Sequence, residues 1–146
     1  MLDYIYMKLQ VQKLYSEAKL PSFAHSHDAG MDLYTVEDVT IEPGERVQIR
    51  TGISMTIPAG YVGLIWDKSG ISHKIGLKTL GGVIDAGYRG EVTVAFVNTS
   101  DTQHVFVIGD KMAQMLIQEV VQPDIVEVSM LEETERGSGA FGSTGK

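Results

Sequence analysis

The chain has 146 residues, of which 43% are hydrophobic, and a net charge of −7, which predicts one compact domain with its own core. Nucleic-acid binding depends on many cationic contacts to phosphate, so the negative charge argues against a general nucleic-acid-binding protein. Cysteine is absent, which excludes disulfides, thiolate metal sites and cysteine nucleophiles and favours a cytoplasmic location. The N-terminus does not resemble a secretory signal and no apolar run approaches the length of a membrane span, so we expect neither secretion nor membrane insertion.

Short apolar segments that alternate with polar residues predict β-strands along most of the chain. Turn signals rich in glycine and proline separate these segments, and no amphipathic helix is evident, so we expect an all-β sandwich or barrel. A single helical turn is predicted over Ser69–Lys74, capped by Ser69 and stopped by Gly76. The predicted strands include 7–14, 47–50, 53–57, 92–96 and 125–128.

The last eleven residues, 136–146, contain four glycines and three hydroxyl residues around a lone Phe141. This segment has too little apolar surface to hold itself in place, and we expect it to be mobile when nothing is bound. The sequence therefore predicts a folded domain over 1–135 followed by a tail over 136–146.

The most informative stretch is 81–91, which reads as a tight hairpin carrying a carboxylate and an aromatic ring. Residues 80–84 and 91–97 are predicted strands, and the Ala86-Gly87 pair is predicted to supply a positive φ between them. Asp85 and Tyr88 would then lie at the tip. The alternative is that Asp85 only accepts hydrogen bonds from the amides of the turn.

Five segments occur in a fixed order and together resemble the five motifs of the trimeric dUTPase family. They are Ala29–Leu33, Asp67–Gly70, Gly82–Glu91, Gly109–Gln114 and Arg136–Gly145. The resemblance implies a jelly-roll-like β-sandwich whose glycine-rich tail closes over the active site. It also implies a homotrimer in which each site is built from three chains.

The same resemblance implies a hydrolase that converts dUTP to dUMP and pyrophosphate with Mg²⁺, limiting uracil in DNA and supplying dUMP for thymidylate synthesis. Asp85 would orient and deprotonate the water that attacks the α-phosphorus. Asp32 resembles the family's water-mediated metal contact, although it could instead fix the loop beside Gly30. The absence of an obvious cage of carboxylates suits Mg²⁺, which usually arrives with phosphates and water.

Binding roles follow from the resemblance, motif by motif. The main chain of Gly82, Val83 and Ile84, together with Thr93, would accept uracil in a cleft that has no space for the methyl group of thymine. Tyr88 would pack against the deoxyribose, with ordinary core packing as its alternative, and Phe141 would stack over the base. The residues assigned to the triphosphate are Lys68, Ser69, Gly70, Gln114, Arg136, Gly142, Ser143 and Thr144.

Physical chemistry supports several of these phosphate roles. The hydroxyl of Ser69 and the amide of Gly70, at the start of a helical turn, are suited to anions. Lys68 and Arg136 would offset the charge of the triphosphate. Gln114 has an alternative as the polar face of an edge strand, Arg136 as a solvated charge, and the tail as a low-complexity end.

Five positions depart from the usual pattern of the family. Lys68 and Lys111 stand where arginine is common, which retains charge but loses bidentate geometry. Asp67 replaces a frequent proline, Gly87 a frequent acidic residue, and Ala140 a glycine beside the tail aromatic. These changes affect phosphate geometry and tail closure without altering the reaction that the resemblance implies.

The residues bear on three rival functions. A dCTP deaminase has the same fold but needs a glutamate base in a Glu-Phe-x-Asn pattern, where this chain reads Ala95-Phe-Val-Asn98. A non-catalytic nucleotide sensor would not need Asp85 or the tail, and both are present. Metal binding by His25 and His27 is a weaker idea, because two loop histidines are usually only exposed side chains.

Overall fold

A computed structural model describes residues 7–140 of the chain. Almost every regular element in this range is a β-strand, and the helical content is one π-helical turn, η1 (Ile71–Ile75). The all-β prediction is therefore confirmed. The strands are β1 (Gln10–Lys13), β2 (Met31–Tyr34), β3 (Val39–Ile41), β4 (Arg46–Arg50), β5 (Ile53–Thr56), β6 (Tyr61–Trp66), β7 (Leu77–Leu80), β8 (Val83–Ile84), β9 (Thr93–Asn98), β10 (His104–Phe106) and β11 (Lys111–Glu119).

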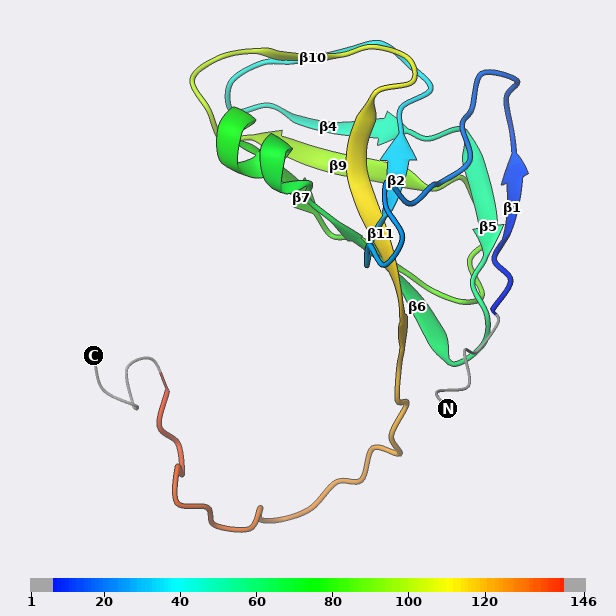
Figure 1. Ribbon diagram of the computed structural model, residues 1–146. Helices are drawn as coiled ribbons and strands as arrows, with labels where there is room; N and C mark the ends of the chain where they lie inside the picture. Colours follow the sequence, from blue (N-terminus) through cyan, green and yellow to red (C-terminus); the bar gives the residue numbers. More distant parts are fainter. Residues whose placement is uncertain (1–6, 141–146) are drawn as a thin grey trace.

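The strands pair antiparallel in four groups, seen together in Figure 1. One sheet has the order β2-β11-β6-β8, and a second has the order β4-β9-β7. Two smaller pairs, β1-β5 and β10-β3, complete the architecture. Because β11 lies between β2 and β6, it connects the parts of the chain that carry the first, second and fourth motifs.

One apolar core lies beneath these sheets, and β9 shows how the sequence produces it. Alternate residues of this strand are buried, including Val94 and Phe96, as the period of two predicts. The ring centroids of Phe96 and of Phe106 on β10 lie 5.8 Å apart. The other large, fully buried apolar side chains include Leu33, Ile41, Ile49, Ile53, Ile57, Leu77, Val92, Met112 and Met115.

The prediction of a single strand over 80–84 is wrong, because this stretch contains the end of one strand and the whole of another, in two different sheets. β7 pairs with β9, and Leu80 lies opposite Ala95, whereas β8 pairs with β6. Thr93 is consequently not opposite Leu80, as a two-residue hairpin would require; it pairs with Arg50 on β4.

The chain changes sheets at Gly81 and Gly82, which have positive φ angles of 64° and 107°. Ala86 and Gly87, which were predicted to supply a positive φ, do not adopt one. Glycine adopts this conformation without steric cost. The positive φ angles of this motif therefore occur where the chain crosses between sheets and not at the tip of the loop.

The predicted helical turn is confirmed and Gly76 ends it, with φ 85° and its amide donating to the carbonyl of Ile71. The predicted cap is wrong, because no side chain caps η1; the carbonyl of Lys68 instead accepts the amides of Ile71 and Ser72. Among residues 7–140, no helix has the length and apolar character that crossing a membrane demands.

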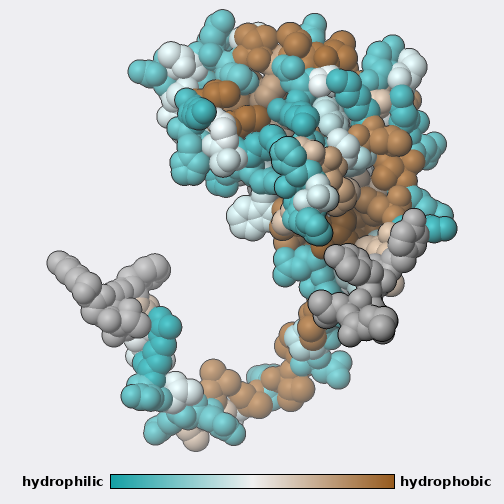
Figure 2. Space-filling model, in the orientation of Figure 1, coloured by the Kyte–Doolittle hydropathy of each residue, from teal (hydrophilic) through white to brown (hydrophobic). Residues whose placement is uncertain are grey.

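After β11 the chain leaves the body as an extended arm over residues 120–140 (Figure 1). The predicted strand over 125–128 is therefore wrong for the single chain, which offers this segment no pairing partner within the described range. Apolar residues are interspersed with polar ones in the half of the arm nearer the body, and polar residues fill the far part (Figure 2). Val121 is 86% exposed and Ile125 is 92% exposed.

Gly82→Ala should destabilise the protein more than Gly81→Ala does. A Cβ at Gly82 would lie 2.8 Å from the carbonyl oxygen of Ile65, whereas one at Gly81 meets nothing within 4 Å. We expect a loss of about 1–2 kcal/mol for Gly81→Ala from its backbone alone, and about 3 kcal/mol or more for Gly82→Ala. Urea unfolding at one protein concentration measures both, and equal losses would contradict the role given to this crossing.

Candidate functional site

Two groups of predicted site residues lie in separate places on the sheets. The first, called here the Asp32 cluster, brings the predicted residues Asp32, Lys68 and Gln114 together with Asp67 and Lys111, which were not predicted site residues. Asp32 on β2 is 3% exposed. Lys68 donates to its Oδ1, and the Nζ of Lys111 lies 2.7 Å from its Oδ2. A nearly buried carboxylate is thereby held between two ammonium groups, each of which extends toward solvent.

Burial and pairing act on the Asp32 carboxyl in opposite directions. Burial raises its pKa, but pairing with Lys111 and Lys68 outweighs this effect and leaves the pKa below its ordinary value. The same pairing raises the pKa of Lys111. Asp32 is thus ionised at neutral pH and fixes two positive charges at one end of the sheet. The alternative in which it only fixes the loop beside Gly30 is not supported, because the partners of its carboxylate are Lys68 and Lys111.

Gln114 is positioned by both neighbours of β11. It lies opposite Asp32 on one side and Trp66 on the other, so the edge-strand alternative is wrong. Its Nε2 donates to the carbonyl of Asp67 at 2.8 Å. A Cβ at Gly30 would collide with the Gln114 amide, so the glycine of the first motif leaves the space that this side chain occupies.

The loop that follows β6 presents the second motif. Ser69 and Gly70 are exposed, while the carbonyl of Lys68 accepts amides from the first turn of η1. Asp67 accepts bonds from the amide and the hydroxyl of Thr79, at 2.7 and 2.6 Å, and from Lys78 at 2.5 Å. Burial raises the pKa of Asp67, but these donors lower it by more than burial raises it, so the pKa lies below its ordinary value.

The second group, the Asp85 pocket, is a cavity of about 120 Å³ formed by the third motif and the start of β9. Asp85 is exposed, and its carbonyl accepts the amide of Tyr88 at 3.1 Å. Among the described residues no group donates to its carboxylate, so the alternative in which turn amides occupy this side chain is not supported. The pocket is lined by Val83, Ile84, Asp85, Tyr88, Glu91 and Thr93.

Tyr88 folds back over its own loop. Its hydroxyl donates to the carbonyl of Glu91 at 3.0 Å, and Gly90 leaves the space that the ring occupies. The side chain is 46% exposed. Ordinary core packing, the alternative for this residue, is therefore wrong.

Two residues that shape the Asp85 pocket were missed by the sequence reasoning. Glu91 accepts bonds from Arg50 at 3.1 Å and from the amide of Gly52 at 2.9 Å, which anchors the base of the loop. Arg89 donates to the carbonyls of Ala86 and Tyr88, which closes the tip. No local signal identifies the role of Glu91, because its partners are about forty residues away. The partners of Arg89 are local, at one and three residues before it, so its position within the 81–91 stretch was the signal that could have found it.

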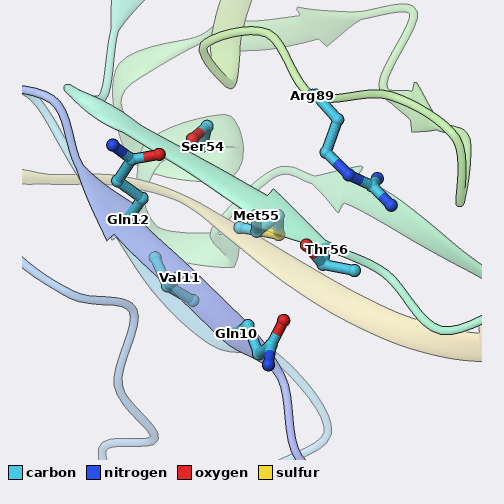
Figure 3. A pocket seen from close by; sticks show the side chains of 7 residues that line it. All are labelled: Gln10, Val11, Gln12, Ser54, Met55, Thr56 and Arg89. Carbon is cyan, nitrogen blue, oxygen red and sulfur yellow. The ribbon is translucent and has the colours of Figure 1, made fainter.

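Arg89 also borders a cleft of about 280 Å³ next to β1 and β5. Figure 3 shows its side chain beside β5, with Gln10 and Gln12 on β1. None of the predicted site residues lines this cleft. The Asp85 pocket, although smaller, contains five of them.

β8 presents a free backbone edge to the Asp85 pocket. Its only neighbour among the described strands is β6, where Ile84 lies opposite Gly63 and Val83 opposite Leu64. The carbonyl of Gly82 accepts the amide of Ile65 at 2.8 Å. Since bonded and non-bonded pairs alternate in an antiparallel ladder, the amide and carbonyl of Val83 point away from β6, toward the open edge.

The fifth motif contributes little geometry within the described range. Arg136 is exposed, and its Nε donates to the carbonyl of Gly139 at 3.0 Å. The other tail residues predicted to contact substrate lie outside the described residues. They are Phe141, Gly142, Ser143 and Thr144.

The donor set near Asp32 bears on the kind of metal that it could hold. No group of three or more His, Cys, Asp or Glu side chains gathers within residues 7–140. His25 and His27 are exposed, and neither belongs to a metal-ligating cluster in that range. Asp32 already faces two ammonium groups, although its Oδ2 accepts no hydrogen bond of good geometry. These residues suit a magnesium ion that arrives with phosphate ligands and keeps its water.

Comparison with known proteins places this arrangement in a family. The sequence profile described as dUTPase matches residues 16–145. The chain belongs to the dUTPase family. Within it, the deoxyuridine 5'-triphosphate nucleotidohydrolase of Clostridium tetani is 45% identical over 140 residues, covering 94% of this chain and 97% of the relative.

Solved structures of dUTPases share the fold. A variant dUTPase of Staphylococcus bacteriophage 80alpha with dUpNHpp superposes with a TM-score of 0.90 at 32% identity, covering 95% of this chain and 99% of that one. A variant from phage phi11 of S. aureus, described with the coordination of a structural Mg(II) ion, gives a TM-score of 0.82 at 31% identity, with 87% and 100% covered. The fold expected from the dUTPase motifs is confirmed.

Asp32→Asn should make the protein less stable at pH 7 and less sensitive to acid. The folded Asp32 carboxyl has a lowered pKa, so the unfolded chain takes up its proton first as pH falls, and the contribution of this carboxylate to stability disappears in acid. We expect a loss of about 1–3 kcal/mol at pH 7 that shrinks toward pH 3. Urea unfolding across this pH range measures it, with Asp124→Asn on the exposed arm as the control. A difference that stays constant with pH would contradict the ion-pair account.

Proposed function

We propose that this chain hydrolyses dUTP to dUMP and pyrophosphate, with Asp85 activating the water that attacks the α-phosphorus. The observation that carries the proposal is the Asp85 pocket, in which an exposed carboxylate with no donor among the described residues lies beside a tyrosine and a free strand edge. Membership of the dUTPase family supports the same activity. The family's pyrophosphohydrolase chemistry needs a general base, a surface that recognises the nucleobase, and groups that bind the phosphates.

Uracil recognition is assigned to the main chain of the third motif. The free amide and carbonyl of Val83 form the donor–acceptor pair that a uracil edge requires, while the carbonyl of Gly82 is already bonded to Ile65. Thr93 lines the opposite side of the pocket, where its hydroxyl accepts a bond from Gln48 at 2.6 Å. Backbone donors on rigid strands discriminate strongly, since a mismatched base leaves them unpaired.

The triphosphate is assigned to Lys68 and Gln114 of the Asp32 cluster and to the exposed part of the loop that follows β6. Lys68 supplies positive charge, and Ser69 and Gly70 present a hydroxyl and an amide on the exposed face of the loop. Gln114 is placed next to this loop by its bond to Asp67. A magnesium ion held by the phosphates would supply charge neutralisation for the leaving pyrophosphate, and Asp32 would contact it through water.

The tail is assigned a closing role. Arg136 would add charge against the phosphates, Phe141 would stack over the base, and Gly142, Ser143 and Thr144 would wrap the chain around the triphosphate. Closure excludes water and fixes the geometry of attack, which is the usual contribution of a lid to the rate. The boundary of this tail at residue 136 and a cytoplasmic location stay predictions.

A homotrimer with shared sites accounts for two features of the single chain. No hydrogen bond or ion pair joins the Asp32 cluster to the Asp85 pocket among residues 7–140, although the reaction needs both. The arm also exposes Val121, Ile125, Met130 and Leu131, each at 81% or more. Exposed apolar runs of this kind mark a contact surface, and the occupant that we propose is a second copy of this chain.

The deaminase alternative lacks its base in the folded chain as well as in the sequence. Ala95 is half-buried in β9 opposite Leu80 and Gln48, and brings no carboxylate to this strand. A nucleotide sensor and a hydrolase would both bind dUTP, but only the hydrolase would turn it over. An activity measurement therefore distinguishes between them.

Pyrophosphate release from dUTP with Mg²⁺ tests the proposed activity. We expect release from dUTP, little from dTTP, dCTP or UTP, and none after EDTA is added. Asp85→Asn, which keeps the size of the side chain, should lower kcat by at least a hundredfold because it removes the general base. Tight binding of dUpNHpp without any turnover of dUTP would overturn the hydrolase proposal and support the sensor.

Coexpression of two inactive chains tests the shared site. Asp85→Asn and a chain truncated after Glu135 should each be inactive alone. Mixed trimers contain some sites with both an intact Asp85 and an intact tail only if these come from different chains, so we expect a measurable fraction of wild-type activity. Mixed assemblies, verified by two affinity tags, that stay inactive would show that each site takes its hairpin and its tail from one chain.

A further inference from the structure

The loop over 67–70 is tied to three strands by two consecutive residues. Lys68 pairs with Asp32 on β2, and the carbonyl of Asp67 accepts the amide of Gln114 on β11. The third tie is the carboxylate of Asp67, which accepts bonds from β7. Only this third tie involves no residue assigned to substrate, so it can be altered without removing a proposed ligand contact.

The tie to β7 is well built. One oxygen of Asp67 accepts both the amide and the hydroxyl of Thr79, at 2.7 and 2.6 Å, and the other accepts Lys78 at 2.5 Å. The Asp67 side chain is 15% exposed and Thr79 is 8% exposed, whereas the Lys78 side chain is 53% exposed. Bonds to a charged acceptor are strong when they are shielded from water, so Thr79 is the more important partner and Lys78 the lesser one.

We infer that Asp67 is a positioning residue that holds Lys68, Ser69 and Gly70 in place for a polyphosphate. This inference rests on the proposed function, because it takes these three residues as the phosphate contacts. The loop has few apolar anchors of its own, since Ser69 and Gly70 are exposed. Without the carboxylate of Asp67, the loop would keep its links to Gln114 and Asp32 but lose its fixed distance from β7.

The consequence is a selective effect on phosphate binding. Deoxyuridine would occupy the Asp85 pocket, which lies outside this hydrogen-bond network, while dUpNHpp needs the loop as well. Loosening the loop should therefore weaken dUpNHpp and leave deoxyuridine unchanged. A residue that only stabilises the fold would weaken both ligands, or neither.

Calorimetric titration of the full-length chain with dUpNHpp and with deoxyuridine, in the presence of Mg²⁺, tests the inference. We expect Asp67→Ala, which removes both acceptor oxygens, to weaken dUpNHpp by about tenfold, and Thr79→Val, which removes only the hydroxyl donor, to weaken it by about fivefold. The double variant should be no worse than Asp67→Ala, because both changes act on the same link. Thr79→Ser, which keeps the hydroxyl, and Lys78→Met, which removes the exposed partner, are the controls and should stay within about twofold of wild type.

Several outcomes would overturn the inference that Asp67 positions the loop. Unchanged affinity of both variants for dUpNHpp, or an equal loss for deoxyuridine, would show that Asp67 has no selective positioning role. Circular dichroism and urea unfolding identify a variant that has lost its fold, in which case Thr79→Val, the milder change, decides. Failure of the proposed function is distinguishable, since the wild-type chain itself would then not bind dUpNHpp or not release pyrophosphate from dUTP.

Discussion

The passage of the chain from one sheet to the other at Gly81 and Gly82 is the constraint on which the third motif depends. β7 must end in the sheet that contains β9, and β8 must begin in the sheet that contains β6. Only residues without a Cβ adopt the required positive φ angles at low cost. The result is a two-residue strand with one bonded edge and one free edge, directly before Asp85. A regular hairpin would have paired that free edge with β9.

The second organising feature is the pairing of two lysine side chains with one carboxylate. Asp32 is buried by β2 and β11, and it holds Lys68 and Lys111 apart from each other at fixed positions. A protein with a net charge of −7 can thereby present two ammonium groups, held at one carboxylate, to a polyanion. Because both lysines are point charges without a planar fork, they tolerate a range of phosphate orientations. Orientation then has to come from directional groups such as Gln114 and the backbone amides.

The sequence was most informative where neighbouring residues determine the structure. Alternation predicted β4, β5 and β9, and the resemblance to the dUTPase motifs implied that Lys68 and Gln114 would share a site. It failed where distant partners decide. A Gly-Gly pair indicates a positive φ but not a change of sheet, and nothing near Asp67 or Glu91 reveals that Thr79 or Arg50 will bind them. The alternation over 125–128 predicts a strand, but a strand also needs a neighbour, which the single chain does not provide.

In the proposed homotrimer, the exposed arm after β11 has a consequence for the time between synthesis and assembly. A newly made chain carries an extended segment with β-branched residues such as Ile125, Val126 and Val128 uncovered, the composition that favours pairing with other unfolded chains. Pro123, Asp124 and Glu127 interrupt this segment, and acidic residues follow at 132, 133 and 135. Proline and like charges oppose stacking of identical strands. In the proposed trimer the arm would pack against a folded neighbouring chain, while its proline and like charges oppose pairing between arms, which favours ordered assembly over aggregation.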